Sequence, residues 1–236
     1  LYNYTSGNDT LIGGAGNDRV YQYATGNKTV DLGAGDDIVY TSASYANADG
    51  AVSYTGGLGN DTFNTYDSSD TYYFNRGDGQ DIIIDNSASS TSTDTVVFGE
   101  GILAQHVDFY YAANLNLVAA LLDDTGVPTG DQITVKNAFT NELYEIERFV
   151  FADGSEISAA QIRQSAKLMG TDAANALIGS ALDDHIMGLG GNDSLKDGYL
   201  GNDLLEGGAG NDSLYAYDGD DTLIGGEGDD KLYNYT

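Results

Sequence analysis

The chain has 236 residues, 37 acidic and 9 basic, and a formal net charge of −28 at neutral pH. This acidity argues against nucleic acid as a partner, because a phosphate backbone is bound through Lys and Arg. Cysteine is absent, and no apolar run approaches the length of a membrane span, so we expect no disulfides and no membrane insertion.

Residues 1–85 carry the first copies of a nine-residue phrase, Gly-Gly-x-Gly-Asn/Asp-Asp-x-apolar-x. The clearest copies are 13–21 and 56–64. Glycine tolerates the positive φ angles of a tight turn, and one apolar residue can face inward from a short strand, so each copy predicts a turn followed by a strand. The pattern lapses over 41–54, which predicts a loop or a degraded turn. Lys28 stands at the sixth position, where other copies have aspartate, and predicts a poor metal site.

Residues 86–167 differ in kind. A Ser/Thr-rich linker over 86–94 precedes longer apolar segments at 96–98, 107–122, 133–135 and 146–151. Alternating polarity within them predicts half-buried antiparallel strands. Ser158 is a plausible N-cap for a short helix that ends near Lys167. We therefore predict an inserted β-rich module between two repeat segments, 1–85 and 168–236.

Residues 168–236 return to the phrase almost without a break, and one extra residue, Asp197, interrupts the spacing. The eighth position is apolar throughout the chain, which predicts one inward residue per strand. The residues at this position are Leu11, Val20, Val30, Val39, Phe63, Ile83, Leu177, Ile186, Leu195, Leu205, Leu214, Leu223 and Leu232.

These phrases resemble the RTX, or haemolysin-type, calcium-binding nonapeptide. The resemblance implies an all-β chain folded as a right-handed parallel β-roll in two segments, with Ca²⁺ between turns. It implies that sixth-position aspartates of one turn and of the turn two further on share an ion with backbone carbonyls. The matching aspartates are Asp9, Asp18, Asp37, Asp61, Asp81, Asp184, Asp193, Asp203, Asp212, Asp221 and Asp230. The carbonyls are expected near Gly14, Gly16, Gly33, Gly57, Gly59, Gly188, Gly190, Gly208, Gly210, Gly226 and Gly228.

The alternative reading of the phrases is a set of acidic turns without metal. The aspartates are concentrated in the turns, where divalent cations would neutralise them in place. We therefore expect the roll to be largely disordered without Ca²⁺, so that ion binding and folding form one equilibrium. The segment around 73–85, the β-rich insert and its closing Phe-Ala-Asp-Gly resemble a small module found beside haemolysin-type repeats, which implies a structural insert.

Tyrosines recur at intervals of about two turns, which predicts a stripe on one outer face. Its members are Tyr2, Tyr4, Tyr21, Tyr23, Tyr40, Tyr215, Tyr217, Tyr233 and Tyr235. Strand propensity and stacking explain such a stripe as well as a contact surface for neighbouring fibres or sugars would. The sequence Leu-Tyr-Asn-Tyr-Thr occurs at 1–5 and at 232–236, which favours one unit of a tandem array. Head-to-tail stacking of separate chains is the alternative.

Motifs of zinc proteases, serine hydrolases and phosphate-binding loops are absent, so we expect no enzyme activity. The sequence predicts a rigid extracellular element of a secreted bacterial protein: an adhesin stalk, a surface layer or a matrix fibre. Its expected partners are further copies of the unit and, on the tyrosine face, cell-surface or matrix polysaccharide. The competing hypothesis is an accessory calcium module of a secreted protease, lipase or epimerase. The family resemblance implies type I secretion.

Overall fold

The computed structural model describes residues 1–42, 50–66, 69–86, 92–138 and 144–235. It divides into two compact units, Leu1–Asp108 with Asn116–Ala159, and Phe109–Leu115 with Ala160–Thr236. Residues 43–49 of the expected loop and 87–91 of the expected linker lie outside the described residues. Strand β6 starts at Val52, inside the stretch expected to be irregular. The three-part division at 85 and 167 stays a prediction.

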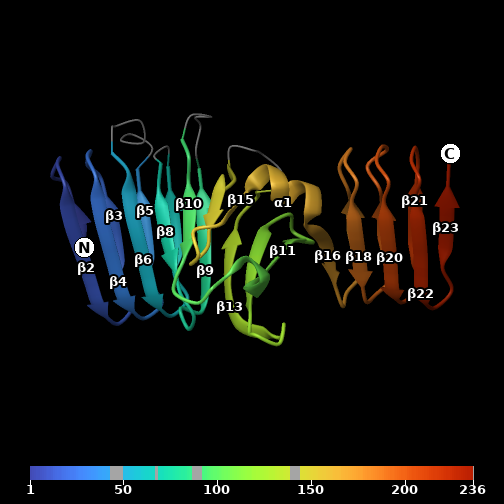
Figure 1. The fold of residues 1–236 in the computed structure, drawn as a ribbon, viewed down its shortest axis with the longest axis horizontal. Coiled ribbons are helices and arrows are strands. Elements are labelled where there is room, and N and C mark those ends of the chain that lie inside the picture. The colour runs from blue at the N-terminus through green and yellow to red at the C-terminus, as the bar shows by residue number, and fades with distance from the viewer. Residues whose placement is uncertain (43–49, 67–68, 87–91, 139–143, 236) are drawn as a thin grey trace. The chain divides into compact units, whose positions relative to one another are not determined.

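In the first unit, the chain alternates between two sheets, and successive strands lie side by side in each (Figure 1). One sheet has the order β1 (Tyr2–Asn3), β3 (Arg19–Gln22), β5 (Ile38–Thr41), β7 (Thr62–Thr65), β9 (Gln80–Asp85), β13 (Pro128–Val135) and β12 (Leu117–Leu122). The other sheet has the order β2 (Asp9–Ala15), β4 (Lys28–Ala34), β6 (Val52–Leu58), β8 (Thr71–Phe74), β10 (Thr95–Phe98), β14 (Arg148–Val150) and β15 (Glu156–Ser158). Strands β1 to β10 pair only in parallel within each sheet, so each coil contributes one strand to each sheet, as in a β-roll.

The eighth-position residues stack into the core between the two sheets. Val20, Val39, Phe63 and Ile83 are paired in register along one sheet and almost fully buried. On the other sheet the column runs from Leu11 through Val30, Tyr54 and Tyr72 to Val96 and Phe149. The predicted inward column is confirmed, and it continues into the β-rich insert.

The insert extends both sheets of the roll. Strand β13 pairs in parallel with β9, and β10 pairs in parallel with β8 and β14. The predicted antiparallel pairing occurs at β12–β13 and β14–β15. Helix α1 covers Ala159–Ser165, shorter than predicted, because Ser158 ends strand β15 and Lys167 begins strand β16. A short 3₁₀ turn, η2, covers Ala104–His106.

The second unit repeats the two-sheet plan. One sheet has β11 (Val107–Ala112), β16 (Lys167–Thr171), β18 (His185–Leu189), β20 (Leu204–Ala209) and β22 (Thr222–Glu227), all parallel. Residues of β11 from Phe109 onward belong to this unit. The other sheet has β17 (Ala176–Ile178), β19 (Ser194–Lys196), β21 (Ser213–Ala216) and β23 (Lys231–Asn234), also parallel. Leu177, Ile186, Leu195, Leu205 and Leu214 form its buried core.

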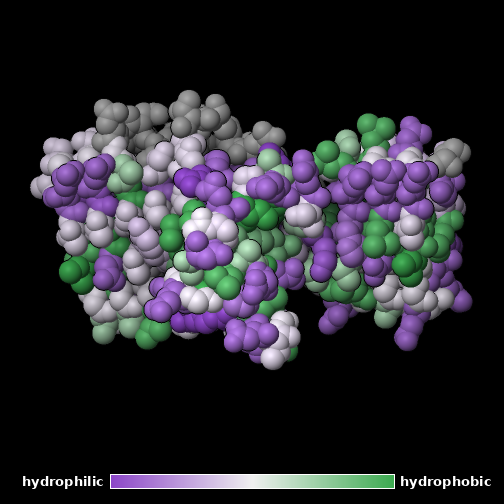
Figure 2. All heavy atoms as spheres, in the orientation of Figure 1, coloured by the Kyte–Doolittle hydropathy of each residue, from purple (hydrophilic) through white to green (hydrophobic). Residues whose placement is uncertain are grey.

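Hydrophilic side chains gather in a band across the coils of the second unit, toward one end of the strands (Figure 2). In the coil of β22 and β23, Leu223 is half-buried and Leu232 is 47% exposed. In the part of the chain that the structure describes, no helix is long and apolar enough to cross a membrane.

Candidate calcium sites

The sixth-position aspartates of the first unit form a ladder at one row of turns. We call Asp18, Asp37, Asp61 and Asp81 the first column. In each step the backbone N–H of one aspartate donates to the Oδ1 of the aspartate in the next coil. The distances are 2.6 Å from Asp18 to Asp37, 2.9 Å from Asp37 to Asp61 and 2.9 Å from Asp61 to Asp81. One carboxylate oxygen of each acceptor residue is thereby used to join neighbouring coils.

The second carboxylate oxygen has no such use. Oδ2 of Asp37 and of Asp61 is buried and has no hydrogen-bond partner among the described residues. Burying an ionised oxygen without a partner is costly, so the arrangement calls for a cation or a proton. Oxygens of carboxylates and backbone carbonyls are the ligands that Ca²⁺ prefers.

The pKa shifts in the first column also favour a bound cation. Burial, with repulsion from neighbouring carboxylates as a smaller cause, raises the pKa of Asp61 to about 7 and that of Asp81 to about 8. Burial also raises the pKa of Asp37. Clustered carboxylates that resist ionisation are stabilised in their charged form by a divalent cation, whose charge is the largest local term in such a site.

The glycines of the phrase make room for this arrangement. A Cβ at Gly56 would overlap Oδ2 of Asp61, so a side chain there would displace the very oxygen that lacks a partner. Gly57 has a φ of 92°, and a Cβ there would overlap the carbonyl oxygen of Gly33 in the preceding coil. The turn sequence thus brings carbonyls and carboxylates into close stacks.

Two further ladders occur in the second unit. We keep the name second column for the other row of turns in the first unit. In the second unit, the third column is Asp184, Asp203 and Asp221, and the fourth column is Asn175, Asp193, Asp212 and Asp230. Their steps have the same N–H to Oδ1 pattern, at 2.7 to 3.0 Å. Oδ2 is again buried without a hydrogen-bond partner, among the residues described, in Asp193, Asp203, Asp212 and Asp221. The donor set therefore fits Ca²⁺ in both units.

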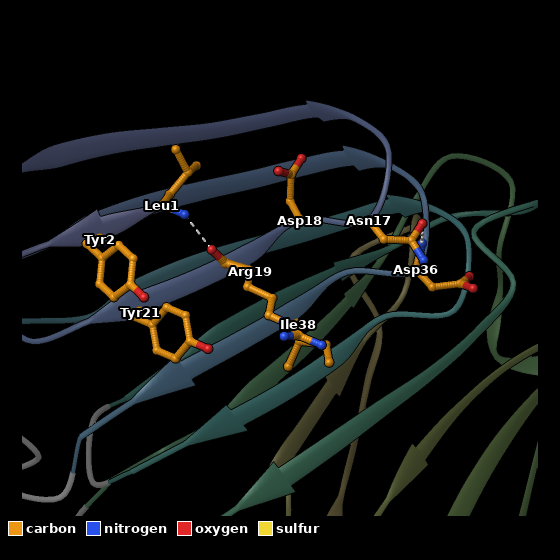
Figure 3. Close-up of a pocket in the computed structure, with 8 residues that line it drawn as sticks. All are labelled: Leu1, Tyr2, Asn17, Asp18, Arg19, Tyr21, Asp36 and Ile38. Atoms are coloured by element: carbon orange, nitrogen blue, oxygen red, sulfur yellow. Dashed lines mark hydrogen bonds between the residues drawn. The ribbon is translucent and has the colours of Figure 1, made fainter.

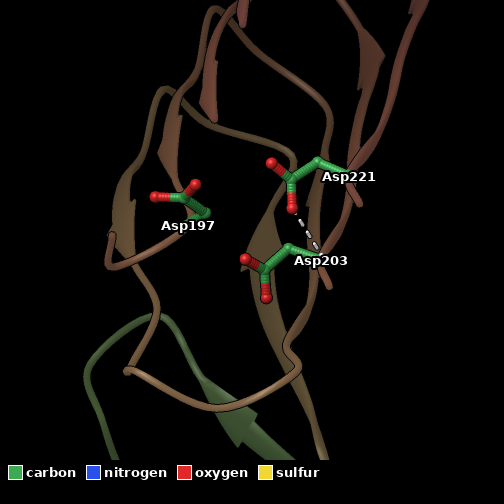
Figure 4. Close-up of side chains that lie close together, drawn as sticks. All are labelled: Asp197, Asp203 and Asp221. Carbon is green, nitrogen blue, oxygen red and sulfur yellow. Dashed lines mark hydrogen bonds between the residues drawn. The ribbon is translucent and has the colours of Figure 1, made fainter. Parts of the chain in front are cut away.

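Asp197 was not predicted as a ligand, yet it lies in the third column's site. One oxygen each from Asp197, Asp203 and Asp221 falls within 4.8 Å of the others (Figure 4). Asp197 is fully buried, and its oxygens accept the backbone N–H groups of Tyr199 and Tyr217. Burial, with repulsion from these neighbours as a smaller cause, raises the pKa of Asp203 to about 6. Asp197 is the extra residue that interrupts the nine-residue period, and this interruption was the sequence signal that could have marked it as a ligand candidate.

In the turn that contains Gly188 and Gly190, the residues at positive φ are their neighbours, and the carbonyl ligands expected near these two glycines stay a prediction. The turn reads Gly188-Leu189-Gly190-Gly191, and positive φ angles occur at Leu189 (74°) and Gly191 (98°). The next coil stacks on these two residues, since Cβ atoms at Gly208 and Gly210 would overlap their carbonyl oxygens. Asp193 keeps its sixth position in the ladder, so Leu189 takes the left-handed conformation, as Tyr199 does in the next copy at a φ of 89°, where the copies at Gly14, Gly33 and Gly57 have glycine. The remaining predicted glycines lie at positive φ in their turns.

The other row of turns in the first unit holds ligand candidates that the sequence analysis missed. We call this the second column; it contains, in register, Asp9, Lys28, Val52, Asp70, Asp94 and Glu147. Oδ1 of Asp70 accepts from the Val52 N–H at 3.3 Å, Oδ1 of Asp94 from the Asp70 N–H at 2.7 Å, and Oε2 of Glu147 from the Asp94 N–H at 2.6 Å. Burial, followed by repulsion from Asp70, raises the pKa of Asp94 to about 9.

Asp9 differs from the other predicted ligands. Its Oδ2 accepts hydrogen bonds from Lys28, Asn3 and Thr5. These bonds, that from Lys28 foremost, lower the pKa of Asp9. Its charge is already paired with a cation of the chain itself.

The predicted tyrosine stripe forms stacked rows in each unit. Tyr2, Tyr21 and Tyr40 stack at centroid distances of 4.8 and 5.3 Å, and Tyr4 stacks on Tyr23 at 5.2 Å. In the second unit, Tyr215 stacks on Tyr233 at 4.9 Å and Tyr217 on Tyr235 at 5.2 Å. Figure 3 shows Tyr2 beside Tyr21 in a groove that also contains Asp18 and Asp36 of the turns.

The two histidines are held by local contacts. Nδ1 of His106 is 3.1 Å from the Gly101 carbonyl oxygen, and Nε2 of His185 is 2.9 Å from Oε1 of Glu206 on the neighbouring strand.

Comparison with known families finds two that match parts of the chain. The RTX calcium-binding nonapeptide repeat matches residues 5–21, 53–83, 169–196 and 197–232. The haemolysin-type calcium binding protein related domain matches residues 127–161, within the β-rich insert. A search of curated proteins found no match to the chain.

The chain is a calcium-binding repeat protein of the RTX type, and its cofactor is Ca²⁺. Repeats of this type are typical of secreted proteins. When bound, Ca²⁺ supplies positive charge to the buried second oxygens of the columns. The chain's own residues contribute the rest: the Oδ1 atoms hold successive coils in register, and the glycines let the coils approach.

Proposed function

We propose that the chain is a Ca²⁺-dependent structural element of a secreted bacterial protein, and that it forms a rigid stalk, surface layer or extracellular fibre. The observation that carries the proposal is a set of buried Oδ2 atoms that have no hydrogen-bond partner among the described residues, in Asp37, Asp61, Asp193, Asp203, Asp212 and Asp221. A solenoid with such rows is strained where calcium is scarce and ordered where it is plentiful, as it is outside the cell.

We further propose that the unit repeats along one chain or stacks head to tail. The two tyrosines of the pentapeptide Leu-Tyr-Asn-Tyr-Thr stack in the same way in both places where it occurs. Tyr2 and Tyr4 stack on Tyr21 and Tyr23 just as Tyr233 and Tyr235 stack on Tyr215 and Tyr217. Superposing the two pentapeptides would make one uninterrupted tyrosine row.

A non-catalytic role agrees with the use of the acidic side chains. The column carboxylates join coils, and both histidines are engaged in local contacts. We propose that these groups hold the coils together and take part in no reaction.

The proposal is tested on the native protein from its source. Immunogold electron microscopy with an antibody to the unit should show label along extended surface structures in calcium, and those structures should collapse in chelator. Denaturing electrophoresis should show a mass of several units for a tandem array, and a band near 25 kDa for stacked single chains. Label confined to a soluble secreted enzyme that carries one unit would contradict the proposal and favour the accessory-module hypothesis.

A further inference from the structure

Lys28 is an unusual residue in this acidic chain because its charged end is buried. It stands at the sixth position of its turn, and its side chain has 0% exposure. A buried ammonium is stable only when acceptors surround it. Its Nζ donates to Oδ2 of Asp9 at 2.8 Å, to the Thr25 carbonyl at 2.9 Å, to the Thr5 carbonyl at 3.2 Å and to the Gly7 carbonyl.

Three of these four acceptors are equivalent to groups that the repeat is expected to offer to calcium. In the turn Thr5-Ser6-Gly7-Asn8-Asp9, Thr5 is at the second position, Gly7 at the fourth and Asp9 at the sixth. They are equivalent to Gly14, Gly16 and Asp18 of the following phrase, where carbonyls and carboxylate are expected to hold an ion. Asp9 and Lys28 are also paired in register on β2 and β4, one coil apart. Lys28 therefore occupies the place of the second carboxylate of a calcium-binding pair.

Charge balance separates this site from the others. Among the described residues, Oδ2 of Asp37 and of Asp61 in the first column is buried with no partner, whereas Oδ2 of Asp9 has three donors. One carboxylate and one ammonium cancel, so the turn is neutral without a metal ion. The three N–H donors of the ammonium are shared among its four acceptors, three carbonyls and one carboxylate.

We propose that the Lys28 ammonium is a built-in replacement for one calcium ion and joins the coils of β2 and β4 at a turn that binds no Ca²⁺. This turn stays closed at calcium concentrations that empty its neighbours. The inference rests on the repeats binding Ca²⁺ and goes beyond the proposed function, since it predicts which turn lacks an ion. It is independent of whether the protein forms stalks or fibres.

The test is the number of ions bound by the full chain, measured by equilibrium dialysis with elemental analysis at saturating calcium. Lys28→Asp restores the second carboxylate and should bind one more Ca²⁺ ion per chain than the unaltered protein. Lys136→Asp is the matched control, because it makes the same change in charge at a half-exposed residue outside every column, and it should leave the number unchanged.

Lys28→Met removes the ammonium but keeps much of its volume. In saturating calcium, amide hydrogens of the first coils, such as those of Gly7 and Asp9, should exchange about 10- to 100-fold faster, because a buried charged partner is lost. Exchange in the second unit should not change.

A folded Lys28→Asp protein that binds the original number of ions would overturn the proposal. If Lys28→Asp fails to order its first coils, Lys28→Met decides: unchanged exchange at Gly7 and Asp9 would equally overturn it. Faster exchange confined to the first coils would support it.

Discussion

At the scale of the residue, each column aspartate has two separate tasks: Oδ1 joins neighbouring coils, and Oδ2 offers negative charge to a cation. In Asp61, Oδ1 accepts the Asp37 N–H, while Oδ2 is buried without a partner among the described residues. A ladder of uncharged acceptors would satisfy the first task as well as aspartate does. Only the second task requires a charge, and that charge is useful only when a cation cancels it.

Asp61→Asn separates the two tasks. The amide oxygen can still accept the Asp37 N–H, but the charged second oxygen is lost, so we expect Ca²⁺ affinity in this part of the roll to fall at least about tenfold. Isothermal titration calorimetry measures the change. Asp31→Asn, on the exposed face of β4, is the control and should titrate like the unaltered protein. Equal titration curves for both variants would remove Asp61 from the ligand set.

At the scale of the element, the repeat phrase predicted the roll because its period fixes both turn and strand. Column positions with the full phrase, such as Asp61 and Asp212, were found from sequence. Asp70 and Asp94 were missed because no glycine occurs in the five residues before either of them, although each begins the same Asp-Thr-apolar sequence as Asp61-Thr62-Phe63. Glu147 has no such signal.

The strands of the insert and their antiparallel pairs were predicted, but their parallel pairing with the strands of the roll was not. Alternating polarity reveals a half-buried strand but does not name its neighbour. Val96 and Phe149 join the core column only through their parallel pairing in the roll's sheet. Asp197 likewise became a ligand candidate only when the fold placed it beside Asp203 and Asp221.

The coils should also depend on pH in a characteristic way once calcium is removed. Folding raises the pKa of Asp203, Asp61 and Asp81 to about 6, 7 and 8, above the ordinary 3.8. The stability that protonation gives is then fully present below about pH 4 and is lost progressively as the pH rises from there toward 8.

In chelator, the β-sheet signal followed by circular dichroism should therefore be greatest at acid pH and fall as the pH rises toward 8. Saturating calcium should abolish most of this fall, because the ionised carboxylates are then the bound form. A β-sheet signal in chelator that grows as the pH rises would show that these carboxylates are not buried as described.

At the scale of the whole molecule, each unit carries a stacked tyrosine row on its surface. Stacked aromatic pairs stabilise neighbouring strands and also leave ring edges available to other molecules. Tyr2, Tyr4 and Tyr235 are more than half exposed, so these rows are available for contact.

Replacing Tyr21, Tyr215 and Tyr233 with Ser should weaken lateral association while calcium binding stays intact, since none of the three belongs to a column. Light scattering in calcium measures association, and calorimetry measures ion binding in the same samples. Normal association by the triple variant would reduce the tyrosine rows to a role in strand stacking.

The central claim is that calcium ions neutralise the buried carboxylates of the columns in both units. Amide hydrogen exchange at neutral pH, compared in saturating calcium and in chelator, tests this directly. We expect the amides that join the columns, such as those of Asp37, Asp61 and Asp193, to be protected in calcium and to exchange freely in chelator. Equal protection in the two conditions would mean that the coils hold together without the ions, and would contradict the account.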